Sequence, residues 1–307
     1  MHVVVMGAGA VGGYFGGVLA NQGEQVTFIA RGNHLKKIKE KGLSIDSHWG
    51  NFNANVTATD DPSNTPPADL IFYSPKLYSN FETLPLISPV VTQKTSILTI
   101  QNGISSGEII SEHFGKEKVL QGATYIESSV AAPGHISQTG PVAKIEFGEE
   151  DGSITNRVQE LSEFLKRPGI QIEVSNNIKK TLWTKLIFVG SIGTIMAATR
   201  SKLSEVFSSP FGYNTIKTTM QEILLVGQSQ GIEFDADLIK NFMDSAEKDA
   251  EHFQASIQYD LFAGKPLELD DLLGSVVKIA YKEGIPVPSS MALITALDKF
   301  KTGKTDK

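Results

Sequence analysis

A glycine-rich turn near the N-terminus is the feature that most constrains how this 307-residue chain can fold. Gly7-Ala8-Gly9-Ala10-Val11-Gly12 follows an apolar segment, 2–6, that we predict to be a strand, and it opens a predicted helix over 11–21. In this turn the first glycine allows a tight bend, the second lets the backbone approach a pyrophosphate, and the third lets the helix pack on the strand. The helix N-terminus adds N–H groups and a positive dipole end. The position of the motif inside a strand–helix–strand pattern favours dinucleotide binding over an ordinary glycine loop.

The end of the second predicted strand, 25–30, indicates which dinucleotide is bound. This position carries an acidic residue when the ligand is the ribose 2′-hydroxyl of NAD, but here it is Arg31. A guanidinium suits a 2′-phosphate, so the sequence favours NADPH over NADH. The alternative is an ordinary exposed arginine after a strand. Asn33, His34 and Lys36 could share the phosphate contact or be solvated.

Composition excludes several classes of function. The chain is 40% apolar and 20% charged, as soluble globular proteins are, and its formal charge of −6 leaves no basic footprint for nucleic acid. With no cysteine it has no disulfide, thiolate nucleophile or cysteine-ligated metal, and its six histidines lack ligand spacing. We interpret the later apolar run, 186–198, as a buried helix rather than a membrane span. We therefore expect a cytoplasmic protein without a metal and without nucleic-acid or membrane partners.

The pattern of elements divides the chain into two predicted domains. Strand and helix signals alternate to residue 175, which predicts a Rossmann-type, doubly wound α/β domain that binds NADP(H), with an antiparallel extension. Helical periodicity dominates from residue 176, which predicts an all-helical substrate and catalytic domain over 176–307. Such a domain can offer a dimer surface, so a homodimer stays open. Further strands are expected at 43–47, 53–59, 69–73, 96–100, 118–126, 136–138, 144–147 and 170–174, and helices at 33–41, 77–87 (broken at Pro85), 106–114 and 155–165.

Three places outside the glycine turn could carry chemistry. Asn102 follows a predicted strand, where open α/β sheets bind ligands, although Asn-Gly is also a common turn. Lys185 lies within an apolar helix, where it is either a snorkelling side chain or a group held at a cleft. Glu268 and Asp270 follow a Gly-Lys-Pro turn, and the simpler interpretation is that they are acids at a helix N-terminus.

Taken in order along the chain, these motifs resemble the ketopantoate reductase family, the NADPH-dependent 2-dehydropantoate 2-reductases of pantothenate synthesis. The resemblance covers nearly the whole chain. It rests on the glycine turn, Lys76, Gln101-Asn102-Gly103, Trp183-Thr184-Lys185-Leu186, Ser256-Ile257-Gln258-Tyr259-Asp260, Gly264-Lys265-Pro266-Leu267-Glu268-Leu269-Asp270 and Gly284-Ile285-Pro286-Val287-Pro288.

The resemblance implies a role for each matching residue. Lys185 corresponds to the catalytic lysine, the general acid that protonates the ketone oxygen as hydride arrives, and an ammonium also stabilises the developing alkoxide. Glu268 corresponds to the acid that helps to hold the lysine and the 2-oxo acid substrate. Ser256 corresponds to a substrate-contacting serine, and Asn102 to a residue at the junction of cofactor and substrate. Lys76 corresponds to a lysine near the nicotinamide.

One departure from the family pattern concerns the substrate. Family members commonly carry asparagines four and eight residues after the catalytic lysine, on the same helix face, where this chain has Val189 and Gly193. From the residues that match the family, we predict reduction of a 2-oxo acid, with 2-dehydropantoate as the first candidate. A more apolar 2-oxo acid and a non-catalytic NADPH sensor remain as alternatives.

Overall fold

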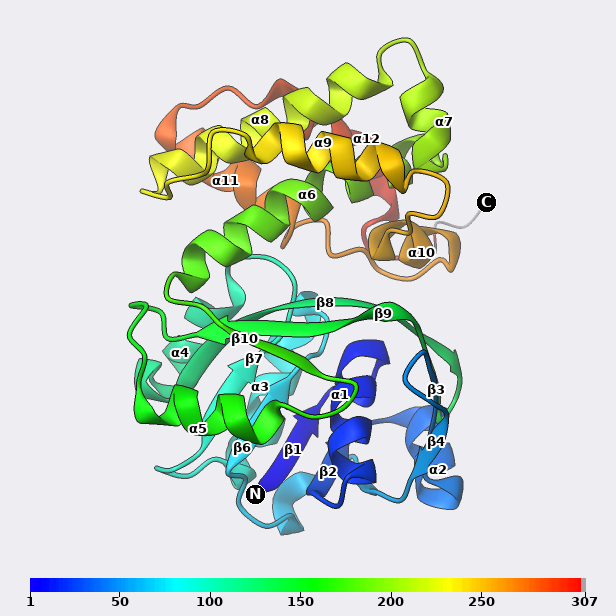
Figure 1. The fold of residues 1–307 in the computed structure, drawn as a ribbon, viewed down its shortest axis with the longest axis vertical. Coiled ribbons are helices and arrows are strands. Elements are labelled where there is room, and N and C mark those ends of the chain that lie inside the picture. The colour runs from blue at the N-terminus through cyan, green and yellow to red at the C-terminus, as the bar shows by residue number, and fades with distance from the viewer. Residues whose placement is uncertain (305–307) are drawn as a thin grey trace. The chain divides into compact units, whose positions relative to one another are not determined.

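The computed structural model describes residues 1–304, which form two compact units. The first unit comprises Met1–Asn102 and Ser106–Ile178 and contains all of the β-structure. The second comprises Gly103–Ser105 and the chain from Lys179 onward, and its regular elements are helices (Figure 1). The predicted doubly wound fold with a helical C-terminal region is confirmed.

The first unit is built on a ten-stranded sheet in the order β4-β3-β9-β8-β7-β6-β1-β2-β5, with β10 paired to β9. From β8 across to β5 the strands run parallel, whereas β8 and β9 form a long antiparallel pair. The chain passes from β1 to β2 on one side of β1 and, after β5, returns to β6 on the other side, so the strand order reverses beside β1. In open α/β sheets, ligands bind at such a switch point, beyond the carboxyl ends of the strands. The strands are β1 His2–Met6, β2 Gln25–Ile29, β3 Leu43–Ser47, β4 Phe52–Ala54, β5 Thr57–Thr59, β6 Leu70–Tyr73, β7 Ser96–Thr99, β8 Val119–Ala132, β9 His135–Gly148 and β10 Gln171–Val174.

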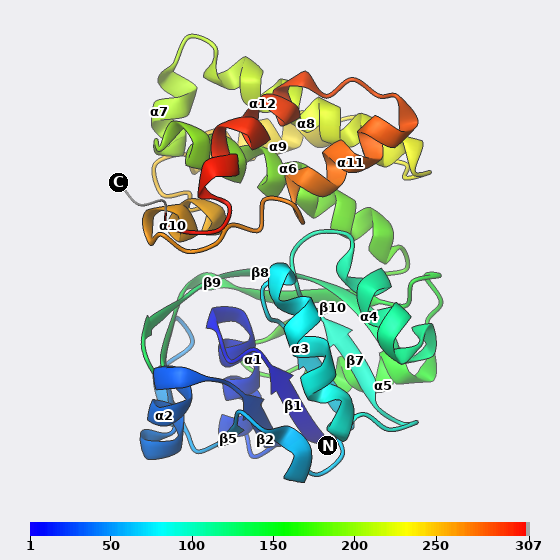
Figure 2. The same ribbon diagram turned by 180° about the vertical axis from the view of Figure 1, so that it is seen from behind.

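Helices cover both faces of this sheet. Successive side chains of a strand point to opposite faces, and in β1 Val3 and Val5 join one core cluster while Val4 and Met6 join the other. Helices α1 (Ala10–Asn21) and α5 (Asn156–Leu165) cover the first face (Figure 1), and α3 (Asn80–Ile87) and α4 (Ser106–Phe114) cover the second (Figure 2). Because both faces are buried, the central strands are continuously apolar, as expected of a parallel sheet.

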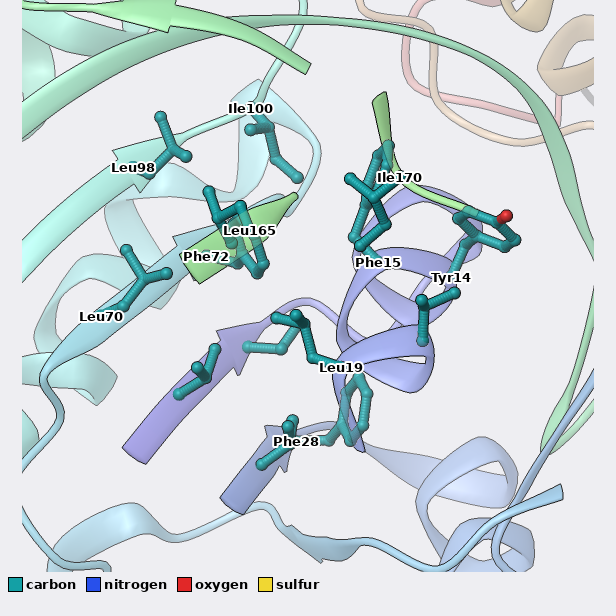
Figure 3. Packing of buried hydrophobic residues seen from close by; sticks show 14 of the residues in the cluster. Tyr14, Phe15, Leu19, Phe28, Leu70, Phe72, Leu98, Ile100, Leu165 and Ile170 are labelled. Atoms are coloured by element: carbon teal, nitrogen blue, oxygen red, sulfur yellow. The ribbon is translucent and has the colours of Figure 1, made fainter. Parts of the chain in front are cut away.

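The larger core cluster fixes α1 against the sheet. Tyr14, Phe15 and Leu19 of α1 are fully buried in this cluster, which also contains Phe72 of β6 and Phe28 of β2 (Figure 3). The Phe15 ring lies between those of Tyr14 and Phe72, with centroids 5.5 Å and 6.5 Å away. The Tyr14 hydroxyl donates to the carbonyl oxygen of Gly169 at 2.9 Å, so its one polar atom is satisfied inside the cluster. This packing holds the start of α1, and hence the glycine turn, beside the end of β1.

Three expectations for the first unit were wrong in detail. The segment predicted as one strand, 53–59, forms β4 and β5, which lie at opposite edges of the sheet. The segments 136–138 and 144–147 belong to one continuous strand, β9. Pro85 does not break α3; it costs one hydrogen bond, and the buried Leu84 and Ile87 hold the helix by packing.

The second unit packs its helices around its own apolar core. Helix α6 (Ile178–Thr199) contributes Trp183, Ile187 and Ile192 to a cluster that it shares with the helices that follow. A smaller cluster joins Ile257 to Leu267 and Leu269. The remaining helices are α7 Leu203–Ser208, α8 Gly212–Ser229, α9 Leu238–Lys248, α10 Ser256–Phe262, α11 Leu273–Glu283 and α12 Pro288–Leu297; helix α2, in the first unit, spans Gly32–Lys41.

Helix α6 is the one helix within residues 1–304 whose length and composition would allow it to cross a membrane. Its 22 residues extend beyond the apolar run over 186–198 that the sequence shows. However, 72% of its most apolar window is buried inside the protein. This agrees with its interpretation as a core helix.

Candidate functional site

The glycine turn connects β1 to α1 at the switch point of the sheet. Gly7 has φ +94°, and a Cβ there would lie 2.9 Å from the backbone nitrogen of Pro75. A Cβ on Gly12 would collide with the Ser74 hydroxyl and with the carbonyl oxygen of Gly7. The first and third glycines are therefore required by close packing between this turn and the loop after β6.

Gly9, the middle glycine, is required for a different reason. It is the N-cap of α1, and no side chain caps this helix. A Cβ on Gly9 would meet no protein atom within 4 Å. The backbone is thus open on this side, next to N–H groups that have no partner within the helix. This arrangement fits the pyrophosphate of a dinucleotide, which such helix N-termini bind.

Arg31 lies at the carboxyl end of β2, as predicted, and is the N-cap of α2. Its side chain is 83% exposed, and its Nη1 atom lies 3.7 Å from a carboxylate oxygen of Glu82, which is 70% exposed. An ion pair this exposed contributes little stability and leaves the guanidinium able to reorient. An anionic ligand beyond the end of β2 would therefore compete with Glu82 for this guanidinium.

The loops that carry Lys76 and Asn102 are tied together by Gln101. The side-chain amide of this buried residue donates to the carbonyl oxygen of Pro75 and to Oδ1 of Asn80, each at 2.7 Å. Both loops follow parallel strands, β6 and β7, so their polar residues share the carboxyl edge of the sheet. Lys76 and Asn102 are partly buried. The network places them on the same sheet edge as the glycine turn.

In the second unit, Lys185 and Glu268 interact electrostatically although 83 residues separate them in the chain. Burial lowers the pKa of Lys185 to about 8, and the nearby carboxylate of Glu268 opposes that decrease. Glu268 is 4% exposed and lies in the irregular segment before α11. The helix N-terminus interpretation of this acid was therefore wrong. A lysine with a pKa lowered to about 8, beside a buried acid, is suited to proton transfer.

The helix face that follows Lys185 is covered over much of its length. Ile192 and Met196 are buried in the helical core. Gly193 is covered by the start of α10. A Cβ added to Gly193 would lie 3.2 Å from the Cγ2 atom of Ile257. Gln258 fastens α10 in place by donating to the carbonyl oxygens of Met196 and Ser201, each at 2.9 Å.

Ser256, which was expected to contact substrate, is exposed at the first position of α10. Val189, at the first of the two positions where the family commonly has asparagine, is partly buried on α6. No group of three potential ligands that could hold a metal ion is found among residues 1–304.

Two residues near the turn have structural roles that their sequence pattern does not indicate. In the sequence Gln101 is only part of a motif, because its network depends on Pro75 in the loop after β6 and on Asn80 at the start of α3. His34 was considered a phosphate contact or a solvated residue, but its ring lies between the carbonyl oxygen of Ala8 and the backbone nitrogen of Gly134. The sequence itself shows only a histidine in the first turn of the predicted helix after Arg31.

Comparisons with known proteins agree on one family. The family model described as ketopantoate reductase PanE/ApbA matches residues 3–152, and its C-terminal counterpart matches residues 177–301. The chain is 31% identical to a 2-dehydropantoate 2-reductase of Pyrococcus abyssi over 293 residues, which is 95% of each chain. It is 28% identical to an uncharacterized oxidoreductase of Bacillus subtilis, over 99% of this chain and 100% of that one. The crystal structure of a ketopantoate reductase from Ralstonia eutropha superposes with a TM-score of 0.91 at 26% identity, covering 98% of both chains.

Proposed function

Because the chain belongs to the ketopantoate reductase family, whose members are oxidoreductases, we propose that it reduces a 2-oxo acid to a 2-hydroxy acid with NADPH. The leading substrate is 2-dehydropantoate, which gives pantoate for pantothenate synthesis. The observation that carries the proposal is the pairing of Lys185, whose pKa is lowered to about 8, with the buried Glu268. A protein that only bound the nucleotide would have no need of a positioned proton donor.

In the proposed reaction, Lys185 is the general acid. Its ammonium donates a proton to the ketone oxygen of the substrate and stabilises the negative charge that develops there. Glu268 keeps the lysine protonated, because its carboxylate raises a pKa that burial has lowered. When bound, NADPH supplies the hydride that attacks the carbonyl carbon. Ser256 and Asn102 are proposed to contact the substrate.

Cofactor binding is assigned to the first unit. The N–H groups at the start of α1 and the open backbone at Gly9 receive the pyrophosphate. Arg31 receives the 2′-phosphate, and Lys76 and Asn102 lie toward the nicotinamide end. The preference for NADPH over NADH rests on Arg31.

A second candidate substrate is a 2-oxo acid with a more apolar side chain. Val189 offers no hydrogen bond, and Gly193 has no side chain, while a Cβ there would already lie 3.2 Å from Ile257. A site that lacks two hydrogen-bonding groups gains less from a hydroxylated substrate such as 2-dehydropantoate.

The test follows NADPH oxidation by absorbance with 2-dehydropantoate and with linear and branched 2-oxo acids. We expect turnover that falls about 100-fold or more in a Lys185→Ala variant, because general acids contribute roughly 10²–10⁴-fold. Lys180→Ala is the matched control, since this lysine lies on the same helix and pairs with Asp235 at 3.0 Å. NADH in place of NADPH tests the cofactor assignment.

The outcomes separate the candidates. Lysine-dependent turnover of 2-dehydropantoate supports the leading substrate, and turnover of another acid alone supports the second candidate. Tight NADPH binding without turnover of any acid would overturn the enzymatic proposal and favour a nucleotide sensor.

A further inference from the structure

His34 joins three segments of the first unit that are distant in sequence. It lies on α2, and its Nε2 atom is 2.7 Å from the carbonyl oxygen of Ala8 in the glycine turn. The backbone N–H of Gly134, in the turn between β8 and β9, donates to its Nδ1 atom at 3.0 Å. The ring is partly buried, so these contacts are not those of a solvated side chain.

The contacts define the tautomer of the ring. A backbone N–H can only donate, so Nδ1 must accept, and the proton of the neutral ring must lie on Nε2. Nε2 therefore donates to the carbonyl oxygen of Ala8. Burial lowers the pKa of His34, which favours this neutral form. The imidazole thus donates to the glycine turn and accepts from the hairpin turn.

The contact with Ala8 also orients the next N–H group. A peptide unit is planar, and in the trans form its C=O and N–H point in opposite directions. No cis peptide bond occurs among the described residues. A hydrogen bond that holds the Ala8 carbonyl toward α2 therefore directs the Gly9 N–H away from α2. Gly9 is the N-cap of α1, where the backbone is open.

We propose that His34 is a positioning residue for the pyridine nucleotide: by holding the Ala8 carbonyl, it aims the Gly9 N–H at the pyrophosphate. This inference rests on the proposed cofactor site but not on the identity of the 2-oxo acid. The contact with Gly134 has a separate role, which is to fasten the β8–β9 turn to α2. The two contacts can be removed one at a time.

Two substitutions separate the roles. In His34→Gln, the amide nitrogen extends to about the position of Nε2 and can still donate to Ala8. In His34→Asn, the amide oxygen can replace Nδ1 and accept from Gly134, but the side chain is too short to reach Ala8. His135→Gln is the matched control, because this histidine is adjacent to Gly134 and pairs with Asp46 at 2.9 Å, away from the glycine turn.

The measurement is the Kd of NADPH, beside that of adenosine 2′-monophosphate, which lacks the pyrophosphate. We expect His34→Asn to weaken NADPH binding about ten-fold or more and His34→Gln to weaken it less than three-fold, since a hydrogen bond to a charged group is worth about 1.5–3 kcal/mol and 1.4 kcal/mol is ten-fold. Binding of the monophosphate should be unchanged in both variants, and the control should bind NADPH normally. Thermal unfolding of each variant measures separately how much stability the substitution removes.

Two results would overturn the inference. If the two His34 variants lose NADPH affinity equally, in proportion to lost stability, the role is merely structural. Equal weakening of NADPH and the monophosphate would show that the pyrophosphate is not involved. If the unmodified protein binds NADH instead of NADPH, the same variants are compared with NADH. If it binds neither nucleotide, the proposed function fails as well, so the two failures are distinguishable.

Discussion

At the scale of single residues, Lys185 should determine how activity depends on pH. A general acid must be protonated, and burial lowers the pKa of this lysine to about 8. We therefore expect kcat/KM to fall as the pH rises through about 8. Glu268→Gln removes the charge that raises this pKa, so the decline should begin at a lower pH in that variant.

The control for this prediction is Asp270→Asn, because Asp270 pairs with Lys301 and does not contribute to the Lys185 shift. Its pH profile should match that of the unmodified protein. A decline near pH 10.5 in the unmodified protein, or a shift to higher pH in Glu268→Gln, would contradict the assignment of the general acid.

The glycine turn gives a second prediction at this scale. Gly12→Ala should destabilise the protein, because its Cβ would collide with Ser74 and Gly7. Gly9→Ala should fold normally, because its Cβ meets no protein atom within 4 Å, yet it should weaken NADPH binding because the methyl group takes space assigned to the pyrophosphate. Urea unfolding and NADPH titration of the two variants test this contrast. Normal NADPH affinity in Gly9→Ala would contradict the placement of the ligand.

At the scale of elements, the sequence was most informative where local signals decide the structure. The helix over Ser106–Phe114 and the strand over His2–Met6 were predicted with their observed bounds, because their apolar spacing and flanking residues agree. The strand β9 was not, because it crosses Gly140 and Pro141 and is held by pairing with β8 and β3. Local propensity carries no information about such long-range pairs.

The same difference between local signals and long-range contacts applies to the candidate site. The glycine turn and Arg31 could be identified because strand, turn and helix are contiguous in the chain. The pairing of Lys185 with Glu268 could be reached only through a family resemblance, since no spacing connects residues on α6 and before α11. The hydrogen bond between His34 and Ala8 could not be predicted at all, because it depends on the position of α2 relative to the glycine turn in the folded protein.

Helix α12 gives the prediction at the scale of elements. Its N-terminal N–H groups, on Ser289 and Ser290, donate to the two carboxylate oxygens of the buried Glu222 from α8, each at 2.8 Å. Glu222→Gln replaces one acceptor by an amide nitrogen that faces a backbone N–H. We expect a loss of about 1–3 kcal/mol in the free energy of unfolding, the cost of a buried donor without a partner. Glu247→Gln, on an exposed position of α9, is the control in urea unfolding, and equal effects of the two changes would contradict this cap.

At the scale of the whole molecule, each unit has its own core and one of the two tryptophans. Trp49, in the first unit, is 51% exposed, whereas Trp183 is buried in the second unit. A Trp183→Phe variant therefore reports unfolding of the first unit by fluorescence, and a Trp49→Phe variant reports unfolding of the second.

Because the proposed cofactor contacts belong to the first unit, NADPH should stabilise mainly that unit. A ligand at 100 times its Kd adds about 2.7 kcal/mol to the stability of the state that binds it. We expect the denaturation midpoint of Trp183→Phe to rise with NADPH concentration accordingly, while that of Trp49→Phe moves less. Measuring the Kd of each variant first ensures that both are compared at the same saturation. If the two midpoints rose equally, unfolding of the units would be coupled, and the assignment of nucleotide stabilisation to one core would be wrong.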